Sequence, residues 1–116
     1  MAKTLDFTTK KKQFMTVKLN DAEKTTLVIN TPTKEVFDIL FECFGKLNEM
    51  EKTNDPKVIK NTFGELYEVC AMAMSHNKNR KHITAADLAK MFDFEDLLLF
   101  FNAYMDFVGE VAATKN

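Results

Sequence analysis

The sequence predicts an α+β domain, mainly α, in which an N-terminal β-hairpin packs on a small bundle of about four helices. Three observations indicate this fold class. Two short segments near the N-terminus are rich in alternating or β-branched apolar residues and are separated by turn residues. The rest of the chain has apolar residues at helical spacing, with start signals for four helices. Its 116 residues suit one hydrophobic core and are too few for two.

We therefore expect a single domain over residues 12–113, with a hairpin at 12–30 and helices within 33–113. Residues 1–11 are polar, rich in Thr and Lys, and without apolar periodicity. They are predicted to form a flexible N-terminal arm.

The hairpin is predicted from a pattern of alternation. In the segment KQFMTVKL, Met15, Val17 and Leu19 alternate with polar residues, as in a half-buried strand. The segment NDAE then supplies turn residues, and KTTLVIN follows with Leu27 and Ile29 on one face. Because an isolated hairpin is only marginally stable in water, its apolar face is expected to rest on the helices.

The first two helices have recognisable N-terminal caps. Thr33 follows Pro32 as a cap candidate, and Asp55 precedes Pro56, which is tolerated at the first helical position. The expected inner face of the first helix consists of Val36, Ile39, Leu40, Cys43, Leu47 and Met50. That of the second consists of Ile59, Phe63, Leu66, Cys70, Ala73 and Met74.

The last two helices also have recognisable N-terminal cap residues. Thr84 with Asp87 three residues later resembles a capping box before the short segment AADLAKMF. Asp93 is the cap candidate for the last helix, which contains FEDLLLFFNAYMDFV. The apolar residues of that helix cover an arc of about 180°, which is wider than a helix needs to cover a core.

Three apolar residues fall among polar neighbours and suggest a surface kept for a partner or for a second copy of the chain. Leu99 lies outside the apolar arc of the last helix, and Phe41 and Met72 lie beside acidic or amide residues. Our candidate protein-binding residues are Leu99 first, and then Phe41, Met72 and Phe107. The alternative is that the last helix is sandwiched between the hairpin and the other helices, so that its whole apolar face is core.

Composition narrows the possible environments and partners. The formal charge of −1 gives the whole chain no electrostatic attraction to nucleic acid or to anionic membranes. No apolar run approaches the roughly 18 residues of a membrane span, and the N-terminus lacks the apolar core of a signal peptide. We therefore expect a cytoplasmic protein without a membrane partner. Cys43 and Cys70 are expected to be free, buried thiols, with a disulfide as the alternative.

Motifs for catalysis, cofactors and metals are missing. The two histidines, His76 and His82, flank a basic connection without a metal-ligand pattern, and no glycine-rich phosphate loop is present. Ser75 is the only serine and lacks a nucleophile context, and the acidic residues of the last helix suit a solvated face. We expect neither an enzyme nor a bound cofactor or metal.

Two basic clusters, Lys10–Lys12 and residues 78–82, raise the possibility of nucleic-acid binding. The second cluster follows the second helix, where cations complement the helix dipole. The helix after it, AADLAKMF, has no Arg, Asn or Gln to read base edges. Nucleic acid is therefore not the expected partner.

The order of the segments resembles a known family. LDFTTKKKQF leads into the hairpin, INTPTKEVFDIL opens the first helix, and LYEVCAMAMSHNKNRKHITAADLAKMFDFEDLLLFFNAYMDFV closes the chain. This layout, from about Leu5 to Val108, resembles the small tail assembly chaperones of long-tailed phages and prophages of Gram-positive bacteria.

The resemblance implies a non-enzymatic function. Members of that family are thought to coat the tape measure protein during tail assembly, keep it soluble and recruit tail tube subunits, and they are absent from the finished virion. The tape measure protein is long, helical and apolar in patches, so its chaperone needs an apolar surface. The seven methionines suit a surface that accepts varied partners, although they also fill gaps in cores. A minor structural or adaptor protein of the tail, and a small DNA-binding phage regulator, are the alternatives.

Overall fold

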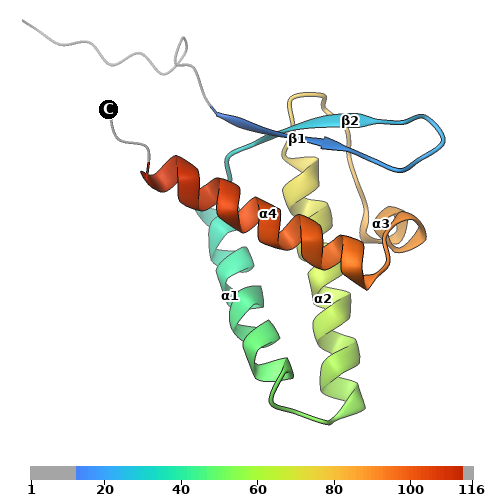
Figure 1. Cartoon of the computed structure of the whole chain (residues 1–116), viewed down its shortest axis with the longest axis vertical. Helices are drawn as coiled ribbons and strands as arrows, with labels where there is room; N and C mark the ends of the chain where they lie inside the picture. The colour runs from blue at the N-terminus through green and yellow to red at the C-terminus, as the bar shows by residue number, and fades with distance from the viewer. Residues whose placement is uncertain (1–12, 114–116) are drawn as a thin grey trace, which may run out of the picture.

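The computed structural model describes residues 13–113 and has the α+β, mainly α architecture (Figure 1). The arm predicted for residues 1–11 lies outside the described residues. In chain order the elements are β1 Phe14–Lys18, β2 Thr26–Asn30, α1 Lys34–Met50, α2 Pro56–Ser75, α3 Ala85–Met91 and α4 Phe94–Ala113. In Figure 1, α1 and α2 run side by side in opposite directions, α4 crosses in front of both, and the hairpin lies at one end.

The antiparallel hairpin has the predicted inner face. Met15 of β1 pairs with Ile29 of β2, and Val17 pairs with Leu27. Leu27 and Ile29 are completely buried, as expected for a hairpin that rests on helices. The turn is closed by Asp21, whose carboxylate accepts hydrogen bonds from the Thr25 hydroxyl (2.6 Å) and backbone N–H (2.7 Å). These bonds lower the pKa of Asp21.

The segment after α2 holds the hairpin in place. The N–H of Asn30 donates to the carbonyl of His76 (2.9 Å), and the N–H of Lys78 donates to the carbonyl of Val28 (2.9 Å). Buried Asn77 binds the carbonyls of Met74 and Lys81 through its amide nitrogen, at 2.7 and 2.9 Å. Residues 76–78 thus pair with β2 through an isolated bridge between Ile29 and Asn77, which ties the hairpin to the end of α2.

All four predicted helix starts are confirmed. Thr84 and Asp87 form a complete capping box, because each side chain accepts a hydrogen bond from the other residue's backbone N–H (3.0 and 3.1 Å). Asp93 and Asp96 make the same exchange at the start of α4 (2.9 and 3.1 Å). The side chains of Thr33 and Asp55 each accept one backbone N–H at the starts of α1 and α2.

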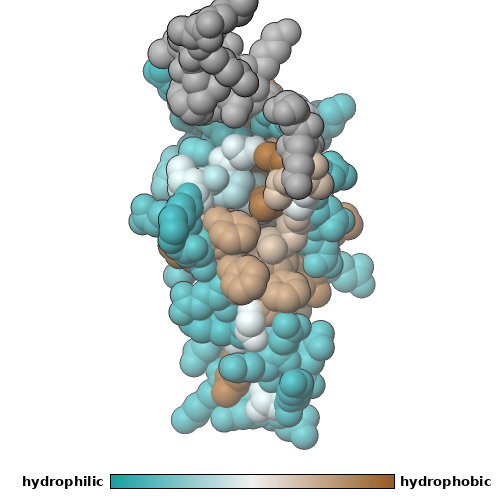
Figure 2. Space-filling model, turned by 90° about the vertical axis from the view of Figure 1, so that its left-hand side faces the viewer, coloured by the Kyte–Doolittle hydropathy of each residue, from teal (hydrophilic) through white to brown (hydrophobic). Residues whose placement is uncertain are grey.

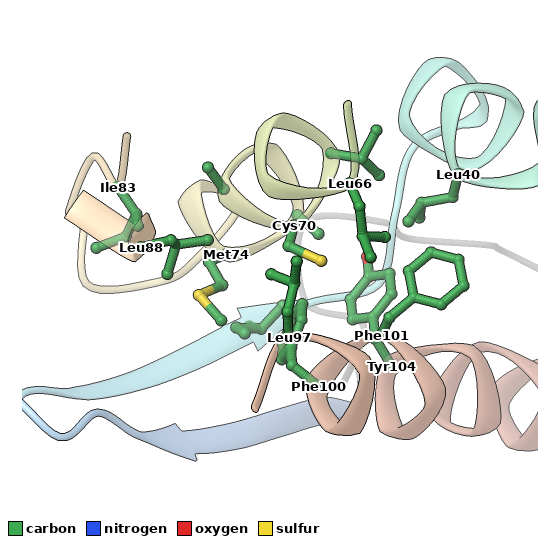
Figure 3. Packing of buried hydrophobic residues seen from close by; sticks show 14 of the residues in the cluster. Leu40, Leu66, Cys70, Met74, Ile83, Leu88, Leu97, Phe100, Phe101 and Tyr104 are labelled. Carbon is green, nitrogen blue, oxygen red and sulfur yellow. The ribbon is translucent and has the colours of Figure 1, made fainter. Parts of the chain in front are cut away.

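The core lies where α4 crosses the α1–α2 pair and extends under the hairpin and α3 (Figure 3). Helix α4 contributes five buried residues to this core: Leu97, Phe100, Phe101, Tyr104 and Phe107. Figure 3 shows residues of α4 facing Cys70 and Met74 of α2 and Leu40 of α1. Cys43 and Cys70 are buried free thiols, as predicted, and desolvation raises the pKa of both.

Three residues of the predicted inner faces, Ile39 and Met50 of α1 and Ile59 of α2, do not belong to the core cluster. Met50 and Ile59 are half-buried. Ile39 was expected on the inner face but is exposed, because α1 turns the row containing Leu40 and Cys43 toward the core. Ile39 therefore lies at the edge of that row and does not take part in the buried cluster.

The hydroxyl of Tyr104 is an unpaired polar group in the core. The side chain is fully buried, its ring points from α4 toward Leu66 in Figure 3, and its oxygen has no hydrogen-bond partner among residues 13–113. Desolvation raises the pKa of this phenol to about 12. The hydroxyl therefore loses its hydration on folding without a hydrogen bond in return.

Replacing Tyr104 with phenylalanine is therefore expected to leave the free energy of unfolding unchanged or raise it by about 1 kcal/mol. Tyr67→Phe is the matched control, because the Tyr67 hydroxyl donates to the carbonyl of Phe92 (2.8 Å). That variant is expected to lose about 1 kcal/mol. Urea denaturation of the three proteins measures the difference, and a loss at Tyr104 equal to that at Tyr67 would contradict the assignment.

Candidate protein-binding surface

Exposed aromatic side chains form a row on α1. Phe37, Phe41 and Phe44 are spaced i, i+4 and i+7, so they share one side of the helix. Phe41 is 62% exposed and Phe44 is 43% exposed, whereas Phe37 is half-buried. The ring centroids of Phe37 and Phe41 are 6.0 Å apart. The row lies next to the buried row of α1, so the helix carries more apolar surface than its packing uses.

The C-terminal part of α4 extends this apolar row. A hollow of about 430 Å³ separates the start of α1 from the end of α4, and its lining includes Pro32, Phe37, Val108 and Val111. We call the surface formed by Phe37, Phe41, Phe44, Val108 and Val111 the aromatic face. Figure 2 shows apolar side chains gathered on this side of the molecule, with hydrophilic side chains on both flanks.

A second hollow surrounds Leu99, the most exposed large apolar residue described, at 71%. It has a volume of about 320 Å³ and lies between β1 and the first half of α4. We call it the Leu99 groove, and its lining includes Met15, Val17, Lys18, Phe92, Leu99 and Phe100.

The strand beside the Leu99 groove has a free outer edge. Val28 and Asn30 of β2 bond to the segment after α2, so their backbone groups point away from β1. Because direction alternates along an antiparallel ladder, the matching groups of β1 that point outward belong to Phe14, Thr16 and Lys18. Within residues 13–113 the sheet has no strand on that side. A free edge of this kind can accept an extended segment.

The aromatic face and the Leu99 groove lie on different sides of α4. Leu99 and Val108 are nine residues apart, which corresponds to about 180° around an α-helix. The two surfaces can therefore be occupied at the same time by different partners.

The four candidate protein-binding residues differ in their burial. Leu99 and Phe41 are exposed, as expected for a binding surface. Met72 is half-buried on α2 and lines neither hollow. Phe107 was expected to contact a partner, but it belongs to the core and is only 9% exposed. Phe107 does not belong to the exposed surface, because α4 turns it toward the same side as the buried residues Phe100 and Tyr104.

Sequence reasoning missed Phe37 and Phe44 as surface residues. Their spacing around Phe41 was a signal that α1 has a second apolar row beside the inner one. The surplus was instead expected mainly on the last helix. Most of that wide apolar arc is core, and its exposed large members are Phe94 and Leu98, whereas Leu99 is exposed outside the arc.

The described residues offer few groups for other chemistry. Residues 13–113 contain no group of three or more His, Cys, Asp or Glu side chains able to hold a metal ion. The same residues include no helix that is both long and apolar enough to span a membrane. In the basic connection, Lys78 lies over the ring of Phe14, 3.8 Å from its centroid, and Lys81 pairs with Glu23 at 3.7 Å.

Comparison of the chain with protein-family models, with curated protein sequences and with solved structures gives no match.

Proposed function

We propose that this chain is a tail assembly chaperone of a long-tailed phage or prophage. It binds the tape measure protein in the host bacterial cytoplasm, helps to recruit tail tube subunits, and is absent from the mature virion. The observation that carries the proposal is the aromatic face, on which Phe41 and Phe44 are exposed and Phe37 lines the hollow beside the apolar end of α4.

An exposed row of aromatic side chains leaves apolar surface in contact with water, which is unfavourable in free energy for a protein that has no partner. Large apolar side chains gain about 1.5–3 kcal/mol each when they are removed from water, so an exposed row favours association. A client that is long, helical and apolar in patches fits such a row, because helices bind to apolar grooves through residues at i, i+3, i+4 and i+7.

The second surface supports a role in recruitment. A chaperone that brings a tube subunit to the tape measure protein has to hold two partners at once. The Leu99 groove and the free edge of β1 lie on the other side of α4 from the aromatic face. Self-association through one of these surfaces is a further possibility for the same reason.

Co-expression tests the proposal. The tape measure protein of the same phage is produced with and without the chain, and its soluble fraction is measured after centrifugation. We expect a clearly larger soluble fraction in the presence of the chain. Equal soluble fractions would refute the chaperone function.

A minor tail component is the main rival, and its test is different. Purified virions are digested and searched by mass spectrometry for peptides of this chain, with the major tail protein as the positive control. A chaperone is expected to be missing from intact virions, whereas a stoichiometric amount of the chain would identify a structural tail protein.

A further inference from the structure

The outer edge of β1 and the Leu99 groove lie side by side. Within residues 13–113, the outward backbone groups of β1 have no strand next to them. The groove beside that edge is lined by Met15 and Val17 of β1 and by Leu99 of α4, which is 71% exposed. A free strand edge next to an apolar hollow favours aggregation, and native proteins usually cover such edges.

The side of α4 that carries Leu99 is acidic. Four exposed acidic residues lie within about 60° of Leu99 around the helix axis: Glu95, Asp96, Asp106 and Glu110. Helix α4 contains no basic residue that would offset them. In the lining of the groove itself, the charged residues are Lys18 and Asp96. An occupant of the groove that extends along this side of α4 is therefore favoured when it has a net positive charge.

The twelve residues that precede Gln13 have this charge and are attached next to the groove. They contain four lysines and one aspartate, which give a formal charge of +3, whereas residues 13–113 have 11 basic and 16 acidic residues, which give −5. Only Gln13 separates them from β1, the strand with the free edge. Fully extended, twelve residues span about 40 Å, whereas the five residues of β1 span about 17 Å. The segment is therefore long enough for a reversal of the chain and a strand along β1.

We propose that residues 1–12 fold back along the outer edge of β1 as a third, antiparallel strand and occupy the Leu99 groove. A connection of about three to five residues is sufficient for such a reversal. Leu5 and Phe7 are two positions apart, so in a strand they share one face and can pack together against Leu99. Lys3 and Lys10–Lys12 lie on either side of this apolar pair and complement the acidic side of α4.

The inference does not depend on the proposed function, because it concerns contacts within a single chain. It adds one condition to that function. A tube subunit that binds to the Leu99 groove has to displace residues 1–12 first.

Photo-crosslinking in the full chain tests the inference directly. Phe7 is replaced with the photoreactive residue benzoylphenylalanine, the protein is irradiated, and the crosslinked peptides are identified by mass spectrometry. We expect crosslinks to the lining of the Leu99 groove, above all to Met15 and Leu99, in a product that migrates as a monomer. A covalent dimer would show that a second copy supplies the segment, and crosslinks only outside the groove, or none, would show that the segment does not occupy it. Either result would overturn the inference.

Hydrogen exchange of single backbone amides, measured by NMR, tests the strand pairing in the full chain. The N–H of Thr16 points away from β2, so a third strand is expected to slow its exchange. In Phe7→Asp, which places a charge against the groove, this N–H is expected to exchange at least about tenfold faster than in the unmodified chain. The N–H of Val17 lies on the β2 side of the ladder, and its exchange should stay the same.

Thr8→Asp is the matched control for that variant. It introduces the same charge at the neighbouring position, which faces away from the groove in the proposed strand. We expect it to change the exchange of the Thr16 N–H by less than about threefold. Melting temperatures show that both variants are folded. Equal exchange of Thr16 in the unmodified chain and in Phe7→Asp, or equal effects of the two substitutions, would contradict the pairing.

Discussion

Phe101→Ala is expected to lower the free energy of unfolding by about 3–5 kcal/mol. Phe101 is 1% exposed and lies at the crossing of α4 with the α1–α2 pair, where Figure 3 shows it beside Leu40 and Tyr104. Removing the ring leaves a cavity that the surrounding helices can fill only in part. A domain of this size has about 5–15 kcal/mol of stability in total, so the loss removes a large fraction of it and leaves the variant marginally stable at the lower end of that range.

Leu99→Ala is the matched control for that prediction. Leu99 comes from the same LLLFF run but is 71% exposed, so its truncation is expected to change the free energy of unfolding by no more than about 0.5 kcal/mol. Urea denaturation followed by circular dichroism measures both variants. Similar losses at Phe101 and Leu99 would show that the described orientation of α4 is wrong.

Phe41→Asp is expected to abolish the ability of the chain to keep the tape measure protein soluble. The substitution puts a charge in the middle of the aromatic face, where a client would have to desolvate it. Because Phe41 is 62% exposed, the melting temperature of the isolated chain should change little. The soluble fraction of the co-expressed tape measure protein gives the result.

Val58→Asp controls for the general effect of a new charge at an exposed apolar position. Val58 is 39% exposed near the start of α2 and does not line the hollow of the aromatic face. It is expected to behave as the unmodified chain does. Loss of solubility with both variants, or with neither, would contradict the assignment of the aromatic face as the client surface.

Much of the fold could be predicted because its signals are local. The hairpin follows from the alternation of Met15 and Val17, and every helix start follows from a cap residue a few positions away. The capping box of Thr84 and Asp87 is the clearest case, since both hydrogen bonds join residues only three positions apart.

The candidate site was predicted less well because it depends on tertiary packing. A helix with a wide apolar arc does not reveal which part of that arc its neighbours cover. In α4 the hairpin and the helix pair cover most of it, so Phe107 is core. In α1 only the row of Leu40 and Cys43 is covered, which leaves Phe44 and Phe41 exposed.

The docking of the hairpin also could not be predicted. It depends on His76 and Lys78, whose backbone groups pair with β2 across more than forty residues of sequence. A polar connection such as NKNRKH contains no apolar pattern from which this backbone pairing could be predicted.

Hydrogen–deuterium exchange tests most directly whether the aromatic face holds the tape measure protein. The exchange of backbone amides is measured by mass spectrometry for the chain alone and for the complex purified after co-expression. We predict slower exchange in the complex over α1 and the second half of α4, with little change in α2. Slower exchange confined to α2 and α3, or no change in α1, would contradict the account.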